Sequence, residues 1–474
     1  MSRDRELEAA IAADPEDPAG YLVYADHLQA AGDPRGDLIA VQAARAADPE
    51  SRELAAAETA LFAAHRRMLF GPETAHAQVE WSHGFWRRLY LGGRPGATAL
   101  DEHAAQLLAC PSAKFLRALH CEGPFTPGVL AQAAPRAATL RELEVSLAPQ
   151  AAFADEDLGA LAPLTRLRGL VLGSCEPVTA GGTAVLGELR ALERLDLRNC
   201  PLTDAIAATL ATLPLGDVTF DAVSAAFSAD GMRVLARAPL RRLHLGTERV
   251  DDAMVAPLAA HPTLANLELN GAVLTAAGVR ALGSAVRLRR LRLASSTIDG
   301  RDLAMLAPLA GRLESLSLNH SDELSDPACE ALSAFERLAF LDVAATAITG
   351  AGLRALGRIG SLAQLDLAFL PLDDADLAAL ASLPALRCLN LAYTQLTDRT
   401  LDTLARLPRL EKLDLAGTKI TAAAIDGLAA MPALLELGLS DCDGDAIERA
   451  YDRPQWHVTT RELIDLDDGL SAAW

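Results

Sequence analysis

The feature that most constrains the fold is a unit of about 24 residues that recurs along most of the chain. Three consecutive units read LAQLDLAFLPLDDADLAALASLP (362–384), LRCLNLAYTQLTDRTLDTLARLP (386–408) and LEKLDLAGTKITAAAIDGLAAMP (410–432). Aligned on the first leucine of the motif LxxLxL, the unit begins fourteen times, in steps of 23 to 27 residues, at Leu116, Leu140, Leu167, Leu192, Leu215, Leu240, Leu264, Leu288, Leu313, Leu338, Leu362, Leu386, Leu410 and Leu434. The unit at Leu215 is weak, because Val218 and Phe220 replace two of its leucines. A period of this length is typical of a chain that stacks one small structural unit many times.

Each unit combines one strand with one helix. In LxL the leucines alternate with variable residues, which predicts a short strand with leucines in the core and variable side chains outward. In the second half of one unit, the apolar residues from Leu401 to Leu407 are three apart, a helical spacing. We expect Thr397 to cap this helix, Asp398 to stabilise its positive end, and Pro408 to mark its exit. Stacked units then bury their apolar sides against one another.

The consensus of the unit, LxxLxLxxTxLTxxxLxxLxxLPxL, resembles ribonuclease-inhibitor-like and F-box-type leucine-rich repeats over about two-thirds of the chain. The resemblance implies an α/β solenoid, with parallel strands on the concave face and helices on the convex face. The helical segments before the repeats predict a small N-terminal all-α domain in addition. It also implies that position nine of each unit turns inward and hydrogen-bonds the backbone of the turn. That position holds Cys175, Cys200, Ser296, Thr346, Thr394, Thr418 and Cys442.

A second motif, YLVYADHLQAAGDPRGDLIAVQ (21–42), lies near the N-terminus. It resembles the bacterial repeat-companion domain, whose pattern is approximately LVYADWLEExGDPRGEFIxLQ and whose biochemical activity is not established. Here His27 takes the place of the usual tryptophan. Asp33 followed by Pro34 predicts a helix that begins with Asp33 as its N-cap. Because Asp26 and His27 point in different directions on a helix, we interpret Asp26 as the partner of Arg35 and not as a catalytic group.

These features divide the chain into four parts: a helical repeat-companion domain (1–75), an N-terminal hairpin or cap (76–115), about 14 leucine-rich repeats (116–442) and a C-terminal cap (443–474). The segment VEWSHGFWRRLYLGG (79–93) alternates apolar residues around a His-Gly turn, which predicts a β-hairpin over the first repeat. The last part breaks the period and adds Tyr451, Trp456 and Trp474. We expect it to cover the last repeat, since an open solenoid exposes apolar faces at its ends.

Charge and composition argue against several classes of function. A formal net charge of −20 opposes binding to phosphate backbones, so we expect no nucleic-acid partner. The chain has no run of 18 apolar residues and its charged first residues lack a signal-peptide core. We therefore expect a cytoplasmic monomer with no membrane partner. The seven cysteines include no CxxC pair and no Cys/His ligand spacing, so we expect no disulfide, no metal and no cofactor.

Sequence motifs of common enzymes are missing as well. The chain has no phosphate-binding glycine loop, no GxSxG and no HExxH, so we expect no catalytic residues. A repeat array presents a large surface whose outward residues vary without cost to the core. We interpret the chain as a non-enzymatic scaffold that binds a protein or peptide on its concave face. The alternative is a regulator of an enzyme, similar to a GTPase-activating protein or a ubiquitin-ligase adaptor, by fold analogy alone.

The outward strand positions divide the concave face into two zones. The first, which we call the basic centre, contains Arg242, His244, Arg290 and Arg292. The second, the acidic-aromatic zone, contains Phe340, Asp342, Asp366, Phe369, Tyr393 and Asp414. Phe369 and Tyr393 share a register in adjacent repeats, roughly 5 Å apart. Beside them runs a row of small residues that would let a partner approach the sheet: Ala344, Ala368, Ala392 and Ala416.

Asp342 and Asp366 also lie one strand apart, where like charges repel. We expect the fold to have no need of this acidic row, whereas a cationic partner would relieve the repulsion. The alternative is a solvated acidic face on an acidic protein. The sequence therefore favours a partner segment with basic and apolar groups that packs on Phe340, Phe369 and Tyr393, and the basic centre is the competing site.

Overall fold

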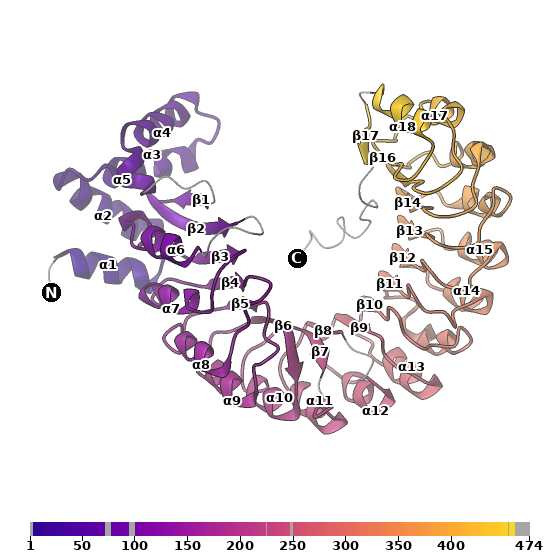
Figure 1. Ribbon diagram of the computed structural model, residues 1–474, viewed down its shortest axis with the longest axis horizontal. Helices are drawn as coiled ribbons and strands as arrows, with labels where there is room; N and C mark the ends of the chain where they lie inside the picture. Colours follow the sequence, from indigo (N-terminus) through magenta and orange to yellow (C-terminus); the bar gives the residue numbers. More distant parts are fainter. Residues whose placement is uncertain are drawn as a thin grey trace. The chain divides into compact units, whose positions relative to one another are not determined.

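Figure 1 shows the computed structural model of the chain. It describes residues 3–71, 77–93, 100–223, 225–246, 250–453 and 455–459. The chain divides into two compact units, Met1–Phe227 and Ser228–Trp474, which are described separately. Within the repeats of each unit, strands form one side and helices the other (Figure 1).

The first unit contains the N-terminal helices and the first repeats. Its α-helices are α1 (Arg3–Ala13), α2 (Pro18–Ala30), α3 (Pro34–Ala47), α4 (Arg52–Ala64), α5 (Arg66–Phe70), α6 (Asp101–Leu108), α7 (Val129–Ala133), α8 (Asp155–Leu158), α9 (Ala180–Thr183) and α10 (Asp204–Leu210). Its 3₁₀ helices are η1 (Pro111–Ala113), η2 (Ala134–Arg136), η3 (Gly159–Leu161) and η4 (Ala184–Glu188). Its strands are β1 (Ala77–Ser82), β2 (Phe85–Gly92), β3 (Ala118–Glu122), β4 (Glu142–Ser146), β5 (Gly169–Leu172), β6 (Arg194–Leu202) and β7 (Asp217–Val223).

The sheet of this unit begins with a hairpin. Strands β1 and β2 are antiparallel, and from β2 to β7 each strand is parallel to the next. His83 and Gly84 form the hairpin turn, with φ of +51° and +74°. Two left-handed residues in a two-residue turn match the twist of the flanking strands. The predicted hairpin over the first repeat is confirmed, because β2 pairs with β3.

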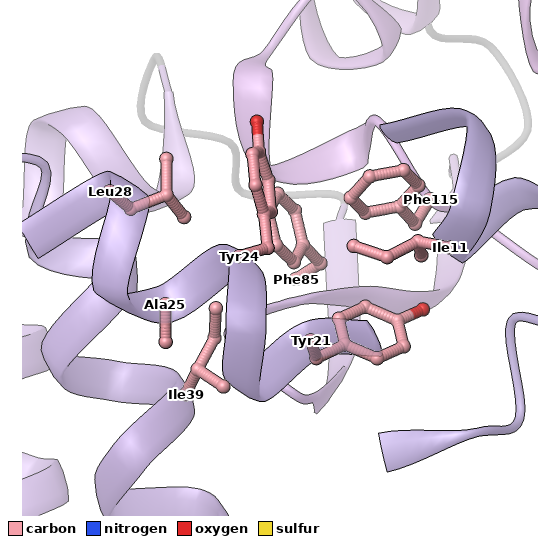
Figure 2. Close-up of a cluster of buried hydrophobic side chains, with 8 residues drawn as sticks. All are labelled: Ile11, Tyr21, Tyr24, Ala25, Leu28, Ile39, Phe85 and Phe115. Carbon is pink, nitrogen blue, oxygen red and sulfur yellow. The ribbon is translucent and has the colours of Figure 1, made fainter. Parts of the chain in front are cut away.

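The N-terminal helices and the hairpin share one hydrophobic core (Figure 2). Tyr24 of α2 stacks on Phe85 of β2 with ring centroids 6.1 Å apart, and Phe115 meets Phe85 edge-on at 4.7 Å. The other buried members of this core are Ile11, Tyr21, Ala25, Leu28 and Ile39. Tyr24 and Ala25 of the N-terminal motif thus serve packing between the helices and the repeats. Membership in the repeat-companion family and the four-part division of the chain stay predictions.

The turn between α2 and α3 confirms one expectation and corrects another. Asp33 caps α3 and accepts a hydrogen bond from the backbone N–H of Arg35 at 3.0 Å. The guanidinium of Arg35 also binds Asp33, and it lies 5.3 Å from the ring centroid of Phe85. Asp26 is exposed. Our pairing of Asp26 with Arg35 was wrong, because the guanidinium of Arg35 binds the carboxylate of Asp33, two residues earlier in the chain.

The second unit contains the later repeats. Its strands are β8 (Arg242–Gly246), β9 (Asn266–Asn270), β10 (Arg290–Arg292), β11 (Ser315–Ser317), β12 (Phe340–Asp342), β13 (Gln364–Asp366), β14 (Cys388–Asn390), β15 (Lys412–Asp414), β16 (Glu436–Gly438) and β17 (His457–Thr459). Its α-helices are α11 (Ala229–Leu235), α12 (Asp252–Val255), α13 (Ala276–Gly283), α14 (Asp326–Leu332), α15 (Gly350–Leu356), α16 (Leu401–Leu404), α17 (Ala422–Leu428) and α18 (Gly444–Tyr451). Its 3₁₀ helices are η5 (Ala256–Leu258), η6 (Asp302–Leu309), η7 (Asp376–Ser382) and η8 (Asp398–Thr400).

Every strand from β8 to β17 is parallel to the next, as the repeat predicts. The central leucine of each LxL holds the same register in neighbouring strands, for example Leu341, Leu365 and Leu389. These side chains are fully buried. The leucines that recur in the sequence therefore form the core, and the residues between them are free to differ.

A hydrogen-bonded clip joins successive repeats on the helix side. Asp398 accepts bonds from the backbone N–H of Thr421 at 2.8 Å and from its hydroxyl at 2.6 Å. Asp374 holds Thr397 in the same way, at 2.9 and 2.6 Å. The same clip joins Asp155 to Thr179, Asp252 to Thr275 and Asp326 to Thr349. Thr397 caps its own helix, as expected, and Asp398 has this additional role in the next repeat.

The described part of the C-terminal segment extends the sheet. Strand β17 pairs in parallel with β16, and α18 precedes it. Trp456 is buried, whereas Tyr451 is exposed. Trp474 lies outside the described residues, so the full extent of the expected C-terminal cap stays a prediction.

Candidate functional site

The outward residues of β12 to β15 form two rows across the sheet. The first row contains Phe340, Gln364, Cys388 and Lys412, and the second contains Asp342, Asp366, Asn390 and Asp414. The strand members of the acidic-aromatic zone are thus neighbours. Phe340, Asp342 and Asp414 are only 4%, 5% and 0% exposed. Their side chains are buried here, and their role as partner contacts stays a prediction.

The second row has a structural role in the turn that follows each strand. Each side-chain oxygen accepts a hydrogen bond from the backbone N–H two residues later. The pairs are Asp342 with Ala344 (3.1 Å), Asp366 with Ala368 (2.9 Å), Asn390 with Ala392 (3.0 Å) and Asp414 with Ala416 (2.9 Å). Such Asx turns satisfy backbone groups at the strand ends. Our expectation that the fold has no need of this row was therefore wrong.

Two carboxyl groups of this row resist ionisation. Burial, together with the charge of the neighbouring Asp342, raises the pKa of Asp366 to about 7. Burial also raises the pKa of Asp342, although its hydrogen bonds from Ala344 and from the Ser317 hydroxyl act in the opposite direction. Asn390 donates to Asp366 Oδ2 at 3.1 Å. At neutral pH the row therefore carries less negative charge than its sequence implies.

Phe369 and Tyr393 lie beyond the ends of β13 and β14, and we call this pair the aromatic platform. Their ring centroids are 4.7 Å apart and their planes differ by 8°. The residues are 48% and 38% exposed. They are adjacent, as the repeat register predicts, and that they bind a partner stays a prediction.

The backbone of the platform is in the left-handed region. The φ angles of Phe369 and Tyr393 are +60° and +56°. Most side chains avoid this region, and a bulky residue there is an outlier that costs about 1–2 kcal/mol. The equivalent position elsewhere holds small or polar residues such as Asn199, Ser295 and Gly417, also with positive φ. The fold needs the turn at this position, but it does not need aromatic rings there.

Tyr393 is held in place on the side away from Phe369. Its hydroxyl donates to Asp441 Oδ2 at 2.6 Å, two repeats further along. This hydrogen bond raises the pKa of Tyr393. A Cβ atom at Gly417 would lie 2.4 Å from the ring of Tyr393, so glycine is required for the ring to take this position. The two stacked rings thus form one held surface.

The row of alanines beside the platform is buried and offers no surface to a partner. Ala344, Ala368, Ala392 and Ala416 pack together as a buried cluster. The expectation that a partner approaches the sheet along this row was wrong. The alanine methyl groups contribute to the interior at the point where the strands end, and the accessible surface is the platform itself.

The basic centre lies on β8 to β10. Glu268 of β9 lies 3.9 Å from Arg242 Nε and 3.7 Å from His244 Nδ1. Arg292 is its register partner on β10. A small cavity of about 60 Å³ is lined by Arg242, Asn266, Glu268, Arg290, Leu291, Arg292, Ser315, Ser317 and Phe340. The four predicted residues therefore lie on neighbouring strands, and Glu268 is within 4 Å of two of them, Arg242 and His244.

Sequence reasoning missed a third cluster, on β2 to β4 of the first unit. His120 Nδ1 lies 2.9 Å from Glu144 Oε2, and the rings of His120 and Tyr90 are 4.7 Å apart. These residues and Glu122 line a cavity of about 410 Å³. Reading the outward positions from Leu116 instead of Leu140 identifies His120. A histidine beside a carboxylate can transfer protons. The adjacent Cys121 is a poor nucleophile for such a pair, because burial raises the pKa of its thiol.

The side chains at position nine have the structural role expected of them. Thr394 and Thr418 donate to the carbonyls of Leu391 and Leu415 at 2.6 and 2.5 Å, and Cys442 Sγ lies 3.0 Å from the latter. Burial raises the thiol pKa of Cys200 to about 12, so this cysteine is a thiol at neutral pH. Among the residues that the structure describes, no three His, Cys, Asp or Glu side chains are placed to hold a metal ion.

Residues 191–213, which include β6 and α10, match the family model described as Leucine Rich Repeat. The fold is a leucine-rich-repeat fold. Similar solved structures include an internalin, InlF, from Listeria monocytogenes, with 20% identity over 70% of this chain and 87% of that chain and a TM-score of 0.46. A leucine-rich-repeat protein of Leptospira interrogans has 18% identity over 77% of this chain and 93% of that chain, with a TM-score of 0.44. A comparison with curated proteins finds no match.

The ribonuclease-inhibitor-like or F-box-type subtype of the repeats stays a prediction. In the described ranges, no helix is long and apolar enough to cross a lipid bilayer.

Proposed function

We propose that this chain is a non-enzymatic leucine-rich-repeat scaffold that binds a protein or peptide through the strand side of its second unit, with the aromatic platform as the anchor. The observation that carries the proposal is the left-handed backbone of Phe369 and Tyr393. This conformation costs about 1–2 kcal/mol for each residue, and half-exposed rings recover little of that by burial. Strain that the fold does not need is typical of functional positions.

The chemistry of the platform favours a partner with apolar and basic groups. Exposed aromatic residues are frequent anchors of protein interfaces. The chain carries a net charge of −20, which attracts cationic partners and opposes nucleic acids. We place the protein in the cytoplasm, as a monomer before it binds its partner.

Two competing hypotheses remain part of the proposal. The basic centre is the alternative site, although Glu268 lies within 4 Å of Arg242 and His244. The alternative function, regulation of a GTPase or a ubiquitin ligase, rests on fold analogy. Either function is compatible with a partner that docks on the platform, so the docking site is the first question to test.

The test is capture of partners from a native extract, measured by quantitative mass spectrometry. The double variant Phe369→Ala/Tyr393→Ala should reduce the recovery of captured proteins at least tenfold, because anchor residues of interfaces contribute about 2 kcal/mol or more each. Its melting temperature should stay within about 2 °C of the wild type, because the two rings are largely exposed and small residues occupy the same turn position in other repeats.

A matched control uses other exposed apolar residues of the same unit. Val273 and Val286 are exposed to a similar extent, and Val273→Ala/Val286→Ala should leave capture unchanged. If Arg242→Ala/Arg290→Ala abolishes capture and the platform variant does not, the binding site is the basic centre and the proposal is wrong.

A further inference from the structure

One residue in each repeat occupies the left-handed turn after its strand, and together these residues form a row that we call the turn row. In the C-terminal repeats it contains His320, Ala345, Phe369, Tyr393, Gly417 and Asp441. Successive members are tied across repeats by backbone hydrogen bonds. The N–H groups of His320, Ala345 and Phe369 donate to the carbonyls of Ala344, Ala368 and Ala392, each at 2.9 Å. Neighbours in the row are therefore one strand spacing apart, about 4.8 Å.

The two ends of the aromatic platform differ. On one side, Tyr393 approaches Gly417 and bonds Asp441, so that end is occupied. On the other side, the next member of the row is Ala345, whose side chain is a single methyl group. The following member is His320, which is exposed. The face of the Phe369 ring that points away from Tyr393 therefore borders the space above the methyl group of Ala345.

The spacing of this position suits one flat group. His320 and Phe369 are two strand spacings apart, about 9.6 Å. A planar group between two rings needs about 3.5 Å on each face, or about 7 Å in total. One planar group fits above Ala345, and two do not.

The charges of the surrounding turns favour a cation. The turns at 319–325, 344–349, 368–374, 392–398, 416–421 and 440–443 contain the acidic residues Asp322, Glu323, Asp373, Asp441 and Asp443, besides Asp374 and Asp398, which hold Thr397 and Thr421 on the helix side. The same turns contain one lysine, Lys419, which donates to Gln395 at 2.9 Å. A group that is both flat and cationic is the guanidinium of arginine, which stacks on aromatic faces. An ammonium group has no flat face.

We propose that the notch above Ala345, between His320 and Phe369, binds the guanidinium of an arginine from the partner protein. This inference rests on the proposed function and names the chemistry that the aromatic platform recognises. The arginine stacks on the free face of Phe369, while Tyr393 and its bond to Asp441 hold Phe369 from behind.

The test compares three short peptides that differ in one side chain: acetyl-Gly-Arg-Gly-amide, the same peptide with citrulline, and the same peptide with lysine. Binding to the full chain is measured by NMR titration with ¹³C-labelled phenylalanine, and the Phe369 resonance is assigned by its loss in Phe369→Leu. The arginine peptide should move this resonance and bind at least tenfold more tightly than the citrulline peptide, which is flat but neutral. Equal binding of the arginine and citrulline peptides would overturn the proposal.

Two variants of the notch floor provide the matched control. Ala345→Leu fills the notch and should abolish the shift of the Phe369 resonance, whereas Ala345→Gly leaves the notch open and should preserve it. The Ala345→Leu change should also weaken partner capture. If capture survives Ala345→Leu but is lost in Phe369→Ala/Tyr393→Ala, the arginine notch is refuted and the proposed function stands. If the arginine peptide binds as expected and capture survives both variants, the proposed function fails, and the notch is a guanidinium site that the captured proteins do not use.

Discussion

Replacing Asp342 by asparagine changes the charge of the buried carboxylate row without changing its shape. In the wild type, Oδ1 accepts a hydrogen bond from the N–H of Ala344 at 3.1 Å, and Oδ2 accepts one from the Ser317 hydroxyl at 2.8 Å. Asparagine keeps the first acceptor, and its amide can donate to the hydroxyl oxygen, because a hydroxyl serves as donor or acceptor. The substitution Asp342→Asn therefore isolates the electrostatic contribution.

The magnitude follows from the register of the sheet. Asp342 and Asp366 are partners on adjacent strands, about 5 Å apart. Two unit charges at this distance repel by about 3 kcal/mol at an effective dielectric constant of about 20. The substitution also removes a weaker attraction between Asp342 and Arg292, which lies two strands away. The free energy of unfolding should therefore rise by about 2 kcal/mol. For a unit of about 250 residues, this raises the melting temperature by about 4–8 °C.

The effect should depend on pH in one direction. The pKa of Asp366 is raised to about 7 and that of Asp342 is raised as well, whereas the unfolded chain releases these protons near pH 4. The folded chain therefore binds more protons than the unfolded chain between these values. Stability is present at low pH and is lost as the pH rises through about 7. Near pH 5.5 Asp366 is protonated, so the repulsion is absent in wild type and variant alike.

The assay is thermal unfolding, followed by circular dichroism at pH 5.5 and pH 8.5. Asp342→Asn should melt several degrees above the wild type at pH 8.5 and close to it at pH 5.5. The control is Asp322→Asn, which removes an exposed charge and should change the melting temperature by about 1 °C or less at either pH. A lower melting temperature of Asp342→Asn at pH 8.5, or an equal rise at both pH values, would refute the reasoning.

Three further changes test single contacts. Asp441→Ala should lower the pKa of Tyr393 toward its ordinary value, because the hydrogen bond to this carboxylate raises it; absorbance at alkaline pH should show one tyrosine that ionises earlier than in the wild type. Gly84→Ala should destabilise the first unit by about 2–4 kcal/mol in urea unfolding, since φ is +74° and a Cβ would lie 2.5 Å from a side-chain carbon of α3. Asp374→Ala should cost about 1–2 kcal/mol in the same assay, because it removes two hydrogen bonds to Thr397; unchanged stability would show that the clip does not stabilise the repeats.

Contacts that recur in every repeat could be predicted from the sequence. The leucines of LxL predict parallel strands, because their alternation and period leave one arrangement that buries them all. The buried register of Leu341, Leu365 and Leu389 confirms this. The hairpin was predictable for a similar reason, since alternation around a His-Gly pair matches a two-residue turn.

Hydrogen bonds between a side chain and a backbone could not be predicted in the same way. The Asx turns of Asp342 and Asp366 depend on where an N–H lies two residues later, and residue type alone does not report that geometry. The clip between Asp398 and Thr421 spans 23 residues. The residues near the helix end therefore predicted only that Asp398 stabilises the helix dipole, and not this contact with the next repeat. The pairing of Asp26 with Arg35 failed because Asp33 was nearer to the guanidinium.

A repeat protein provides internal controls for its own functional residues. The turn row takes the same left-handed conformation at Ser295, Gly417 and Asp441 as at the aromatic platform, so the demands of the fold at this position are known from several repeats at once. They are met by small or polar side chains. Phe369 and Tyr393 satisfy the same turn at a higher cost in backbone strain, and Gly417 and Asp441 accommodate the tyrosine ring and its hydroxyl. Four residues from four successive repeats thus depend on one another for a feature that the fold does not require. The partner binding that we propose for the aromatic platform accounts for this dependence.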